Sequence, residues 1–315
     1  MTIDLKPCAA RLAAMDDVCI LAHQHPDGDT LGSGYALAHT LCAMGKRVRV
    51  LCADPIPKDF AFMPDGLREE AGGDAAIVSV DVADEKLLGR IAETYGGQVD
   101  INIDHHATNL MFAKENYVDD SAAATAEMIL DLIDLLGAPL NQQVASCLYA
   151  GISTDTGCFR YQNTTARSHL YAARLMDCGV QTEKLDRMFF ETKSKSYVLL
   201  ERMAMEKMRF FCDDRVALIA VTQEMLEQTG SNDNEYVRLV PQTRQMEGVL
   251  VGVSIRERRD GTYKISLRTN EPVDASAICA KLGGGGHARA AGCASALPLE
   301  TTIQTIITVI EPFLV

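Results

Sequence analysis

The five residues Val18-Cys19-Ile20-Leu21-Ala22 lead directly into the cluster His23-Gln24-His25-Pro26-Asp27-Gly28-Asp29. A short apolar run of this kind predicts a buried strand, and the cluster behind it is rich in carboxylate and imidazole groups. Three further apolar runs end in similar groups: residues 77–80 before Asp81, residues 101–103 before Asp104-His105-His106, and residues 147–152 before Ser153-Thr154-Asp155-Thr156-Gly157. Because the carboxyl ends of parallel strands share one edge of a sheet, we expect these side chains to converge there.

The first part of the chain alternates strand-like and helix-like patterns. Candidate strands are residues 18–22, 48–52, 77–80 and 101–103, and helical patterns cover residues 31–44 and 122–136. Alternation of this kind is typical of βαβ units. The sequence therefore predicts an α/β domain with a parallel sheet and helices on both faces.

The second part of the chain has a different pattern. Candidate strands are residues 216–221, 249–255 and 263–268, the last two joined by an Asp260-Gly261 turn, and helical patterns follow at residues 275–282 and 301–312. These elements predict a smaller α/β domain with a mixed sheet. We expect a first domain over residues 1–184, a helical connector over residues 185–208 and a second domain over residues 209–315.

The composition restricts the classes of partner. The chain of 315 residues holds 30 Lys and Arg against 43 Asp and Glu, a net charge of −13. Nonspecific binding to long nucleic acids depends on Lys and Arg that displace counterions, so this acidic chain is not expected to coat a duplex. Residues 1–180 hold most of the excess, with 25 acidic and 13 basic side chains. A nucleotide ligand there requires something that cancels this charge.

The hydropathy pattern indicates where the protein is located, and the cysteine spacing indicates the redox state of its thiols. No run of eighteen apolar residues is present, and the first 17 residues carry acidic groups where a secretory segment has a basic start. We therefore expect a cytoplasmic protein with no membrane partner. The ten cysteines are scattered without a Cys-x-x-Cys pair, which favours buried, reduced thiols over a zinc or redox centre.

The polar clusters have two interpretations. A single Asp after a strand is most often a turn or helix-cap residue, and a single His is most often a satisfied polar residue. Recurrence favours a metal site, because several carboxylates at one sheet edge repel one another unless cations lie between them. Oxygen ligands with a minority of imidazoles suit Mn²⁺ or Mg²⁺ better than Zn²⁺. Two such ions close together are typical of a phosphoryl-transfer centre.

The ordered set of motifs resembles the DHH phosphoesterase superfamily. The four motifs that carry the resemblance are His23-x-x-Pro26-Asp27-Gly28-Asp29, Asp81, Asp104-His105-His106 and Ser153-Thr154-Asp155-Thr156-Gly157. The tail Gly283-Gly284-Gly285-Gly286-His287-Ala288-Arg289-Ala290-Ala291-Gly292 and the preceding strand Ile265-Ser266-Leu267-Arg268 resemble the DHHA1 companion domain. The length of the chain and the order of its motifs are most similar to those of the stand-alone NrnA-type members. These proteins degrade very short RNAs and dephosphorylate 3′-phosphoadenosine-5′-phosphate (PAP).

The resemblance implies a set of metal ligands: His23, Asp27, Asp29, Asp81, His105 and Asp155. In the family pattern Asp81 bridges two divalent ions, for which Mn²⁺ is favoured and Mg²⁺ is the alternative. A water shared by the two ions would attack phosphorus in line. His106 would contact the scissile phosphate or help to protonate the leaving group, and Asp104 would orient a histidine.

The resemblance also implies substrate contacts. In the second domain they are Arg268, Gly284, Gly285, Gly286 and His287, where the glycine backbone approaches an anion and the side chains bind phosphate. Independently of the resemblance, Asn109 and Arg160 in the first domain follow two of the metal motifs closely and are further candidates, with polar surface roles as the alternative. A flexible turn is the alternative interpretation of the glycine run.

The expected function is hydrolysis of very short oligonucleotides, linear dinucleotides or PAP. A processive exonuclease of the RecJ kind is disfavoured because the chain has no room for additional nucleic-acid-binding modules. An inorganic pyrophosphatase of the same superfamily is the alternative enzyme, disfavoured by the glycine-rich motif. The alternative that is not an enzyme is a catalytically idle nucleotide-binding protein. The sequence does not decide whether the chain forms a homodimer.

Overall fold

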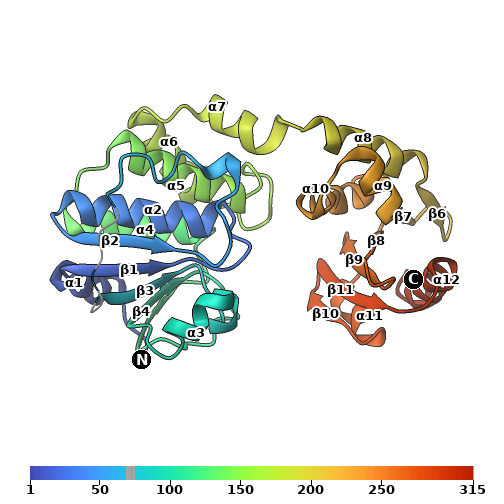
Figure 1. Ribbon diagram of the computed structural model, residues 1–315, viewed down its shortest axis with the longest axis horizontal. Coiled ribbons are helices and arrows are strands. Elements are labelled where there is room, and N and C mark those ends of the chain that lie inside the picture. Colours follow the sequence, from blue (N-terminus) through green and yellow to red (C-terminus); the bar gives the residue numbers. More distant parts are fainter. Residues whose placement is uncertain (69–71, 73–74, 315) are drawn as a thin grey trace. The chain divides into compact units, whose positions relative to one another are not determined.

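The chain folds into two compact units, Met1–Thr192 and Lys193–Val315. The computed structural model describes residues 1–68, 72 and 75–314 (Figure 1). The boundary between the units lies inside the stretch 185–208 that the sequence pattern marks as a connector.

A five-stranded sheet is the centre of the first unit. Its strands are β1 (Asp17–Leu21), β2 (Arg47–Leu51), β3 (Ala76–Val80), β4 (Ile101–Asp104) and β5 (Glu115–Val118). Their order is β2-β1-β3-β4-β5, and every pairing is parallel. The predicted parallel sheet is therefore confirmed. The sequence pattern missed only the edge strand β5, which is short and contains the polar residues Glu115 and Asn116.

Both faces of this sheet are covered. In β1, Val18 and Ile20 face one core and Cys19 and Leu21 face the other, as the alternation of a strand requires. The first core is built with α1 (Leu5–Ala14), α2 (Gly28–Ala43), α4 (Thr125–Leu136) and α5 (Gln142–Asp155). The second core contains side chains from η2 (Glu85–Ile91) and α3 (Ala92–Tyr95). The remaining elements of the unit are η1 (Lys58–Phe60), α6 (Ala166–Asp177), α7 (Thr182–Asp186) and η3 (Arg187–Glu191).

One sequence expectation is wrong. Residues 147–152 do not form a strand that ends at the sheet edge, because they belong to the helix α5. Eight of the nine residues 144–152 are buried, so the run 147–152 has no exposed side. A buried helix and a buried strand cannot be distinguished by periodicity when the apolar run is this short. Asp155 therefore enters its site from the carboxyl end of a helix.

A six-stranded sheet is the centre of the second unit. Its strands are β6 (Arg209–Phe211), β7 (Val216–Val221), β8 (Val251–Glu257), β9 (Tyr263–Thr269), β10 (Gly285–His287) and β11 (Ala290–Ser295). The order is β10-β11-β9-β8-β7-β6, in which only β7 and β8 pair in parallel. The predicted mixed sheet is confirmed, and the turn at Asp260-Gly261 joins β8 to β9.

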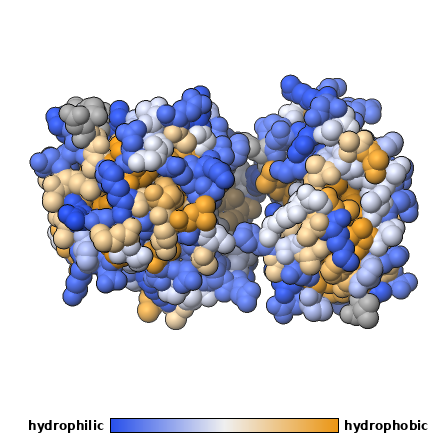
Figure 2. Space-filling view, turned by 90° about the horizontal axis from the view of Figure 1, so that it is seen from below, coloured by the Kyte–Doolittle hydropathy of each residue, from blue (hydrophilic) through white to orange (hydrophobic). Residues whose placement is uncertain are grey.

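Helices lie on both sides of this second sheet. One core contains α11 (Ala275–Lys281) and α12 (Leu299–Ile310), which ends in η5 (Glu311–Phe313). Another contains α8 (Lys195–Glu206), α9 (Gln223–Thr229), α10 (Asp233–Leu239) and η4 (Val240–Arg244). On the face drawn in Figure 2, hydrophilic residues surround scattered apolar patches on each unit. None of the described helices combines the length and the apolar character needed to span a bilayer.

Candidate metal centre

Acidic and histidine side chains meet at the carboxyl edge of the first sheet. His23 follows β1. Asp27 is the N-cap of α2 and accepts hydrogen bonds from the backbone amides of Asp29 and Thr30. Asp81 follows β3, in a backbone conformation with φ of 59°. The remaining members are Asp104 at the end of β4, His105 and His106 directly after it, and Asp155 at the end of α5.

Three groups of side chains have ligand atoms within 4.8 Å of one another. Their members are His23, Asp27 and Asp81; Asp29, His105 and Asp155; and Asp81, His105 and His106. Asp81 belongs to two of these groups: its carboxylate oxygens lie 3.5 Å from Nε2 of His23 and 3.7 Å from Nε2 of His105. All six side chains that the sequence motifs mark as ligands are thus brought together.

The two histidines His23 and His105 are oriented in the same way. Nδ1 of His23 lies 2.8 Å from the carbonyl oxygen of Gln24, and Nδ1 of His105 lies 3.1 Å from that of Ala122. A carbonyl oxygen only accepts, so each Nδ1 carries the proton and each Nε2 points at the carboxylates. A neutral imidazole held by a carbonyl in this manner is the usual form of a metal-ligating histidine.

The carboxylates are crowded and poorly solvated. Asp29 is 1% exposed and Asp81 is 3% exposed. Burial, followed by the charges of Asp81 and Asp155, raises the pKa of Asp29 well above its usual range, and burial raises the pKa of Asp155 to about 6. Burial opposes protonation of His23, but Asp27 and Asp81 raise its pKa to about 11. Without a cation the centre therefore collects protons, and a divalent ion could replace them.

Asp104 supports His106 rather than lying among the ligand groups. Nδ1 of His106 donates to Oδ1 of Asp104 at 2.7 Å, and Nδ2 of Asn109 donates to the other carboxylate oxygen. Asp104 is fully buried, while His106 is half-exposed. Asn109 is engaged at both ends, since its oxygen accepts from the backbone of Met111. Its side chain thus holds Asp104 in place.

Several supporting residues were not found from the sequence. The backbone amides of Thr125 and Ala126, at the start of α4, donate to Asp29 at 2.7 and 2.9 Å, and the Thr125 hydroxyl donates to Asp81. The helix α5 can pass close to Asp29 because Gly151 has no side chain. A Cβ at Gly151 would lie 2.8 Å from Oδ1 of Asp29. The only sequence signal is the run of small residues 121–126 before the helix.

Asn163 is a second supporting residue that sequence reasoning missed. Its Nδ2 lies 3.2 Å from Oδ2 of Asp155 and 2.9 Å from the carbonyl oxygen of Ala123.

Arg160, a predicted substrate contact, donates from Nε to the carbonyl of Gly157 at 2.6 Å, and its guanidinium lies 5.9 Å from the ring centre of Phe190. Arg160 is thus held next to the motif that carries Asp155.

The predicted substrate residues of the second unit lie on neighbouring strands. Arg268 of β9 and His287 of β10 are both in register with Ala290 of β11, which lies between them. Residues that pair across antiparallel strands share a face of the sheet, so Arg268 and His287 flank the small Ala290 on one face. The glycine run is not a free turn, because Gly285 and Gly286 pair with β11.

Comparison with known proteins agrees with this arrangement. The model of the DHH family, N-terminal domain, matches residues 17–152, and that of the DHHA1 domain matches residues 216–314. The chain therefore belongs to the DHH phosphoesterase family and carries a DHHA1 domain.

Its relatives include a bifunctional oligoribonuclease and PAP phosphatase NrnA from Thermus thermophilus, which is 37% identical over 87% of this chain and 83% of that protein. The protein of the same name from Bacillus subtilis is 26% identical over 89% of this chain and 90% of that protein. An exopolyphosphatase-related protein from Bacteroides fragilis has the same fold, with a TM-score of 0.88, 23% identity, and coverage of 98% of this chain and 96% of that one.

Proposed function

We propose that this protein hydrolyses phosphoester bonds in very short oligonucleotides, linear dinucleotides or PAP. The observation that supports the proposal most directly is the convergence of three ligand groups at the sheet edge, with Asp81 in two of them. The names of the relatives from Thermus thermophilus and Bacillus subtilis, oligoribonuclease and PAP phosphatase, support the oligonucleotide and PAP substrates. We further propose the domain limits 1–184, 185–208 and 209–315 and a cytoplasmic location.

The metal-binding part of the proposal assigns two divalent ions to the centre. The ligands are His23, Asp27 and Asp81 for one ion and Asp29, Asp81, His105 and Asp155 for the other. We propose Mn²⁺ as the preferred ion and Mg²⁺ as the alternative, because carboxylate oxygens predominate over imidazoles. Such ions supply positive charge at the phosphate oxygens and lower the pKa of a water molecule at the centre.

The remaining side chains of the first unit position the reacting groups. His106 is held by Asp104 through Nδ1, which leaves Nε2 for the phosphate or the leaving group. Its pKa is raised to about 9, first by the hydrogen bond to Asp104, so a protonated ring is available near neutral pH. We propose Arg160 as a substrate contact, and we propose that Asn109 acts through Asp104.

The second unit is proposed to bind the phosphate or terminal nucleotide of the substrate. Arg268 and His287 offer hydrogen-bond donors on one sheet face, beside the backbone of Gly284, Gly285 and Gly286. Ala290 between them has only a methyl side chain. Long duplexes are outside the proposal, because the net charge of −13 disfavours contact with an extended polyanion.

A comparison of three substrates tests the function. Purified protein with Mn²⁺ should hydrolyse PAP, a diribonucleotide or both faster than inorganic pyrophosphate, and Asp81→Ala should lose nearly all turnover. If PAP and the dinucleotide stay intact while pyrophosphate is cleaved, the protein is a pyrophosphatase. If none is cleaved but PAP binds, it is a nucleotide-binding protein, and both results contradict the proposal.

A further inference from the structure

Two cysteines of the second unit face each other between a helix and the sheet. Cys279 lies on α11 and is fully buried, and Cys293 lies on β11 and is partly exposed. Cys293 is in register with Ile265 of β9, and Ile265 and Cys279 belong to the same hydrophobic core. Residues in register share a face of the sheet, so Cys293 enters this core from the side opposite to α11. No Cys-x-x-Cys spacing marks the pair, which the fold brings together.

Gly284 holds the backbones of the two cysteines close together. Its amide donates to the carbonyl oxygen of Cys279 at 2.8 Å, and a Cβ at Gly284 would lie 2.6 Å from Cβ of Cys293. Because Gly284 has no side chain, β11 can approach the carboxyl end of α11 here. These backbone contacts are independent of the thiols, and they place both cysteines at one point of the interface between helix and sheet.

The two thiols form a hydrogen bond with each other. Sγ of Cys279 donates to Sγ of Cys293, and this bond, together with burial, raises the pKa of Cys279. The same bond lowers the pKa of Cys293, although partial burial opposes the change. Cys293 therefore forms a thiolate more readily than an ordinary cysteine, and solvent reaches it. A thiolate that is accessible and lies next to a second thiol is the usual arrangement of a redox-sensitive cysteine.

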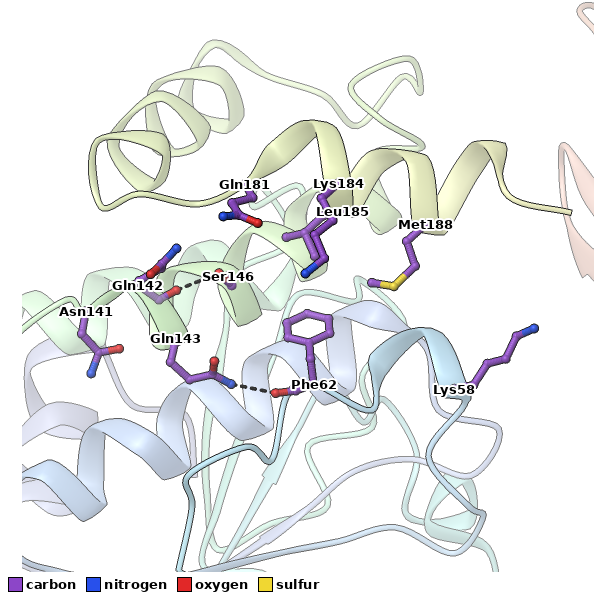
Figure 3. Close-up of a pocket in the computed structure, with 10 residues that line it drawn as sticks. All are labelled: Lys58, Phe62, Asn141, Gln142, Gln143, Ser146, Gln181, Lys184, Leu185 and Met188. Carbon is purple, nitrogen blue, oxygen red and sulfur yellow. Dashed lines mark hydrogen bonds between the residues drawn. The ribbon is translucent and has the colours of Figure 1, made fainter.

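A buried thiol of the first unit provides a contrast. Nε2 of Gln143 donates to the carbonyl oxygen of Met63 at 3.0 Å, in the wall of a cavity of about 650 Å³ (Figure 3). Sγ of Cys147 lies 3.9 Å from the same carbonyl oxygen. Cys147 is fully buried, and burial raises its pKa. A nearby cavity thus does not make this thiol reactive, whereas Cys293 combines exposure with a lowered pKa.

We propose that Cys293 and Cys279 are a site of reversible oxidation, at which a hydroperoxide converts the two thiols into a disulfide. The disulfide would join α11 to the β10–β11 hairpin, which carries the glycine run proposed to bind phosphate. A dithiol reductant would restore both thiols by exchange.

The reaction has two steps. The Cys293 thiolate attacks one oxygen of hydrogen peroxide, the O–O bond breaks, and a sulfenic acid and hydroxide form. The hydroxide takes up the proton that Cys293 released and becomes water. Sγ of Cys279 then attacks the sulfenic sulfur and displaces its hydroxyl group, which leaves as a second water with the proton of Cys279. The two thiols together lose two electrons, and the peroxide gains them.

Peptide mapping of the full-length protein tests the proposal, with hydrogen peroxide as the oxidant and EDTA in the buffer. Trypsin cleaves after Lys281 and Arg289, so Cys279 and Cys293 leave in separate peptides. After free thiols are alkylated, the oxidised sample should contain these two peptides joined, with a mass two hydrogens below their sum. Dithiothreitol should separate them again.

Three variants distinguish the roles of the two thiols. Cys293→Ser should abolish the joined peptides and leave Cys279 unoxidised. Cys279→Ser should leave Cys293 reactive, so its sulfenic acid accumulates and is trapped by dimedone. The matched control Cys212→Ser removes a partly exposed thiol of the same unit, whose pKa is raised by burial and by Glu311. This control should form the joined peptides at the wild-type rate.

In the wild type, the pair should oxidise at least tenfold faster than Cys212. The proposal is overturned if peroxide gives no joined peptides, if the pair oxidises no faster than Cys212, or if Cys279→Ser gives no sulfenic acid at Cys293. None of these measurements uses the metal centre, so their outcome is independent of the proposed hydrolysis.

Discussion

Nδ1 of His106 lies 2.7 Å from Oδ1 of Asp104. The two residues are separated by one position in the chain, yet Asp104 is fully buried and His106 is half-exposed. The other oxygen of Asp104 accepts from Asn109, so the carboxylate is fixed on both sides. This geometry gives His106 one orientation, with Nε2 directed away from Asp104.

Asp104→Asn should therefore lower kcat without preventing metal binding. An asparagine amide nitrogen at this place would face either the donor Nδ1–H of His106 or the donor Nδ2 of Asn109, and one hydrogen bond is lost. Changes to groups that orient a site residue typically cost about 10- to 100-fold in activity. Steady-state hydrolysis of PAP with Mn²⁺ measures the effect.

The control for this substitution is Asp120→Asn, which removes an exposed carboxylate of the same unit. It should leave kcat within twofold of the wild type. The positioning role of Asp104 also predicts that His106→Asn alone and the pair Asp104→Asn/His106→Asn have nearly the same kcat. Additive losses would mean that Asp104 does not act through His106.

Much of the first unit could be predicted from its sequence because short apolar strands alternate with helices. The motif residues follow β1, β3 and β4, so the parallel topology alone brings His23, Asp81 and His105 to one edge. Asp155 reaches the same place by another route, from the end of a helix. The sequence could not reveal this, because the apolar run 147–152 inside α5 is too short and too uniform to distinguish a buried helix from a buried strand.

The hydrogen bonds that hold the buried carboxylates could not be predicted either, but for a different reason. Thr125 and Ala126 are far from Asp29 in sequence, and they bind it through backbone amides that any residue could supply. Only the tertiary packing of α4 against α2 places them. In the second unit, the row formed by His287, Ala290 and Arg268 depends on strand register, which no single motif specifies.

Removal of divalent ions should lower the thermal stability of the first unit. Asp29 and Asp81 are almost completely buried beside other carboxylates, and a cation bound to the folded state relieves their repulsion. At an ion concentration about 100 times Kd, binding contributes about 2.7 kcal/mol, which is several degrees in Tm. Scanning fluorimetry with EDTA and with Mn²⁺ measures the shift. In Asp81→Ala the shift should largely disappear; a full shift there would place the ions elsewhere.

Arg167→Met should destabilise the first unit. The guanidinium lies 3.6 Å from the fully buried carboxylate of Glu127 and also pairs with Asp119 and Asp131. Its loss leaves Glu127 buried without a nearby positive charge, which costs about 3 kcal/mol. Urea unfolding followed by circular dichroism measures the change. Arg174→Met is the matched control, because the ion pair of Arg174 with Asp134 is exposed and contributes less than about 1 kcal/mol. Equal effects of the two substitutions would show that Arg167 does not stabilise the unit by compensating the buried charge of Glu127.

Two adjacent glycines of the second unit should respond differently to alanine. A Cβ at Gly284 would lie 2.2 Å from the carbonyl oxygen of Gly292, whereas a Cβ at Gly285 would meet no atom within 4 Å. Gly284→Ala should therefore shift the β10–β11 hairpin and lower the stability of the unit by about 1–3 kcal/mol. Gly285→Ala should leave unfolding unchanged within about 0.5 kcal/mol.

The fold thus gives no reason for a glycine at 285, and close approach of a substrate gives one. If the glycine backbone contacts the substrate phosphate, Gly285→Ala should raise KM for PAP at least tenfold, because the new methyl group occupies the space of the ligand. The Mn²⁺-dependent shift in Tm should stay as in the wild type, since the metal centre belongs to the other unit. An unchanged KM in a stable Gly285→Ala variant would show that the substrate does not bind along β10, and it would leave Arg268 and His287 as the residues to examine by substitution.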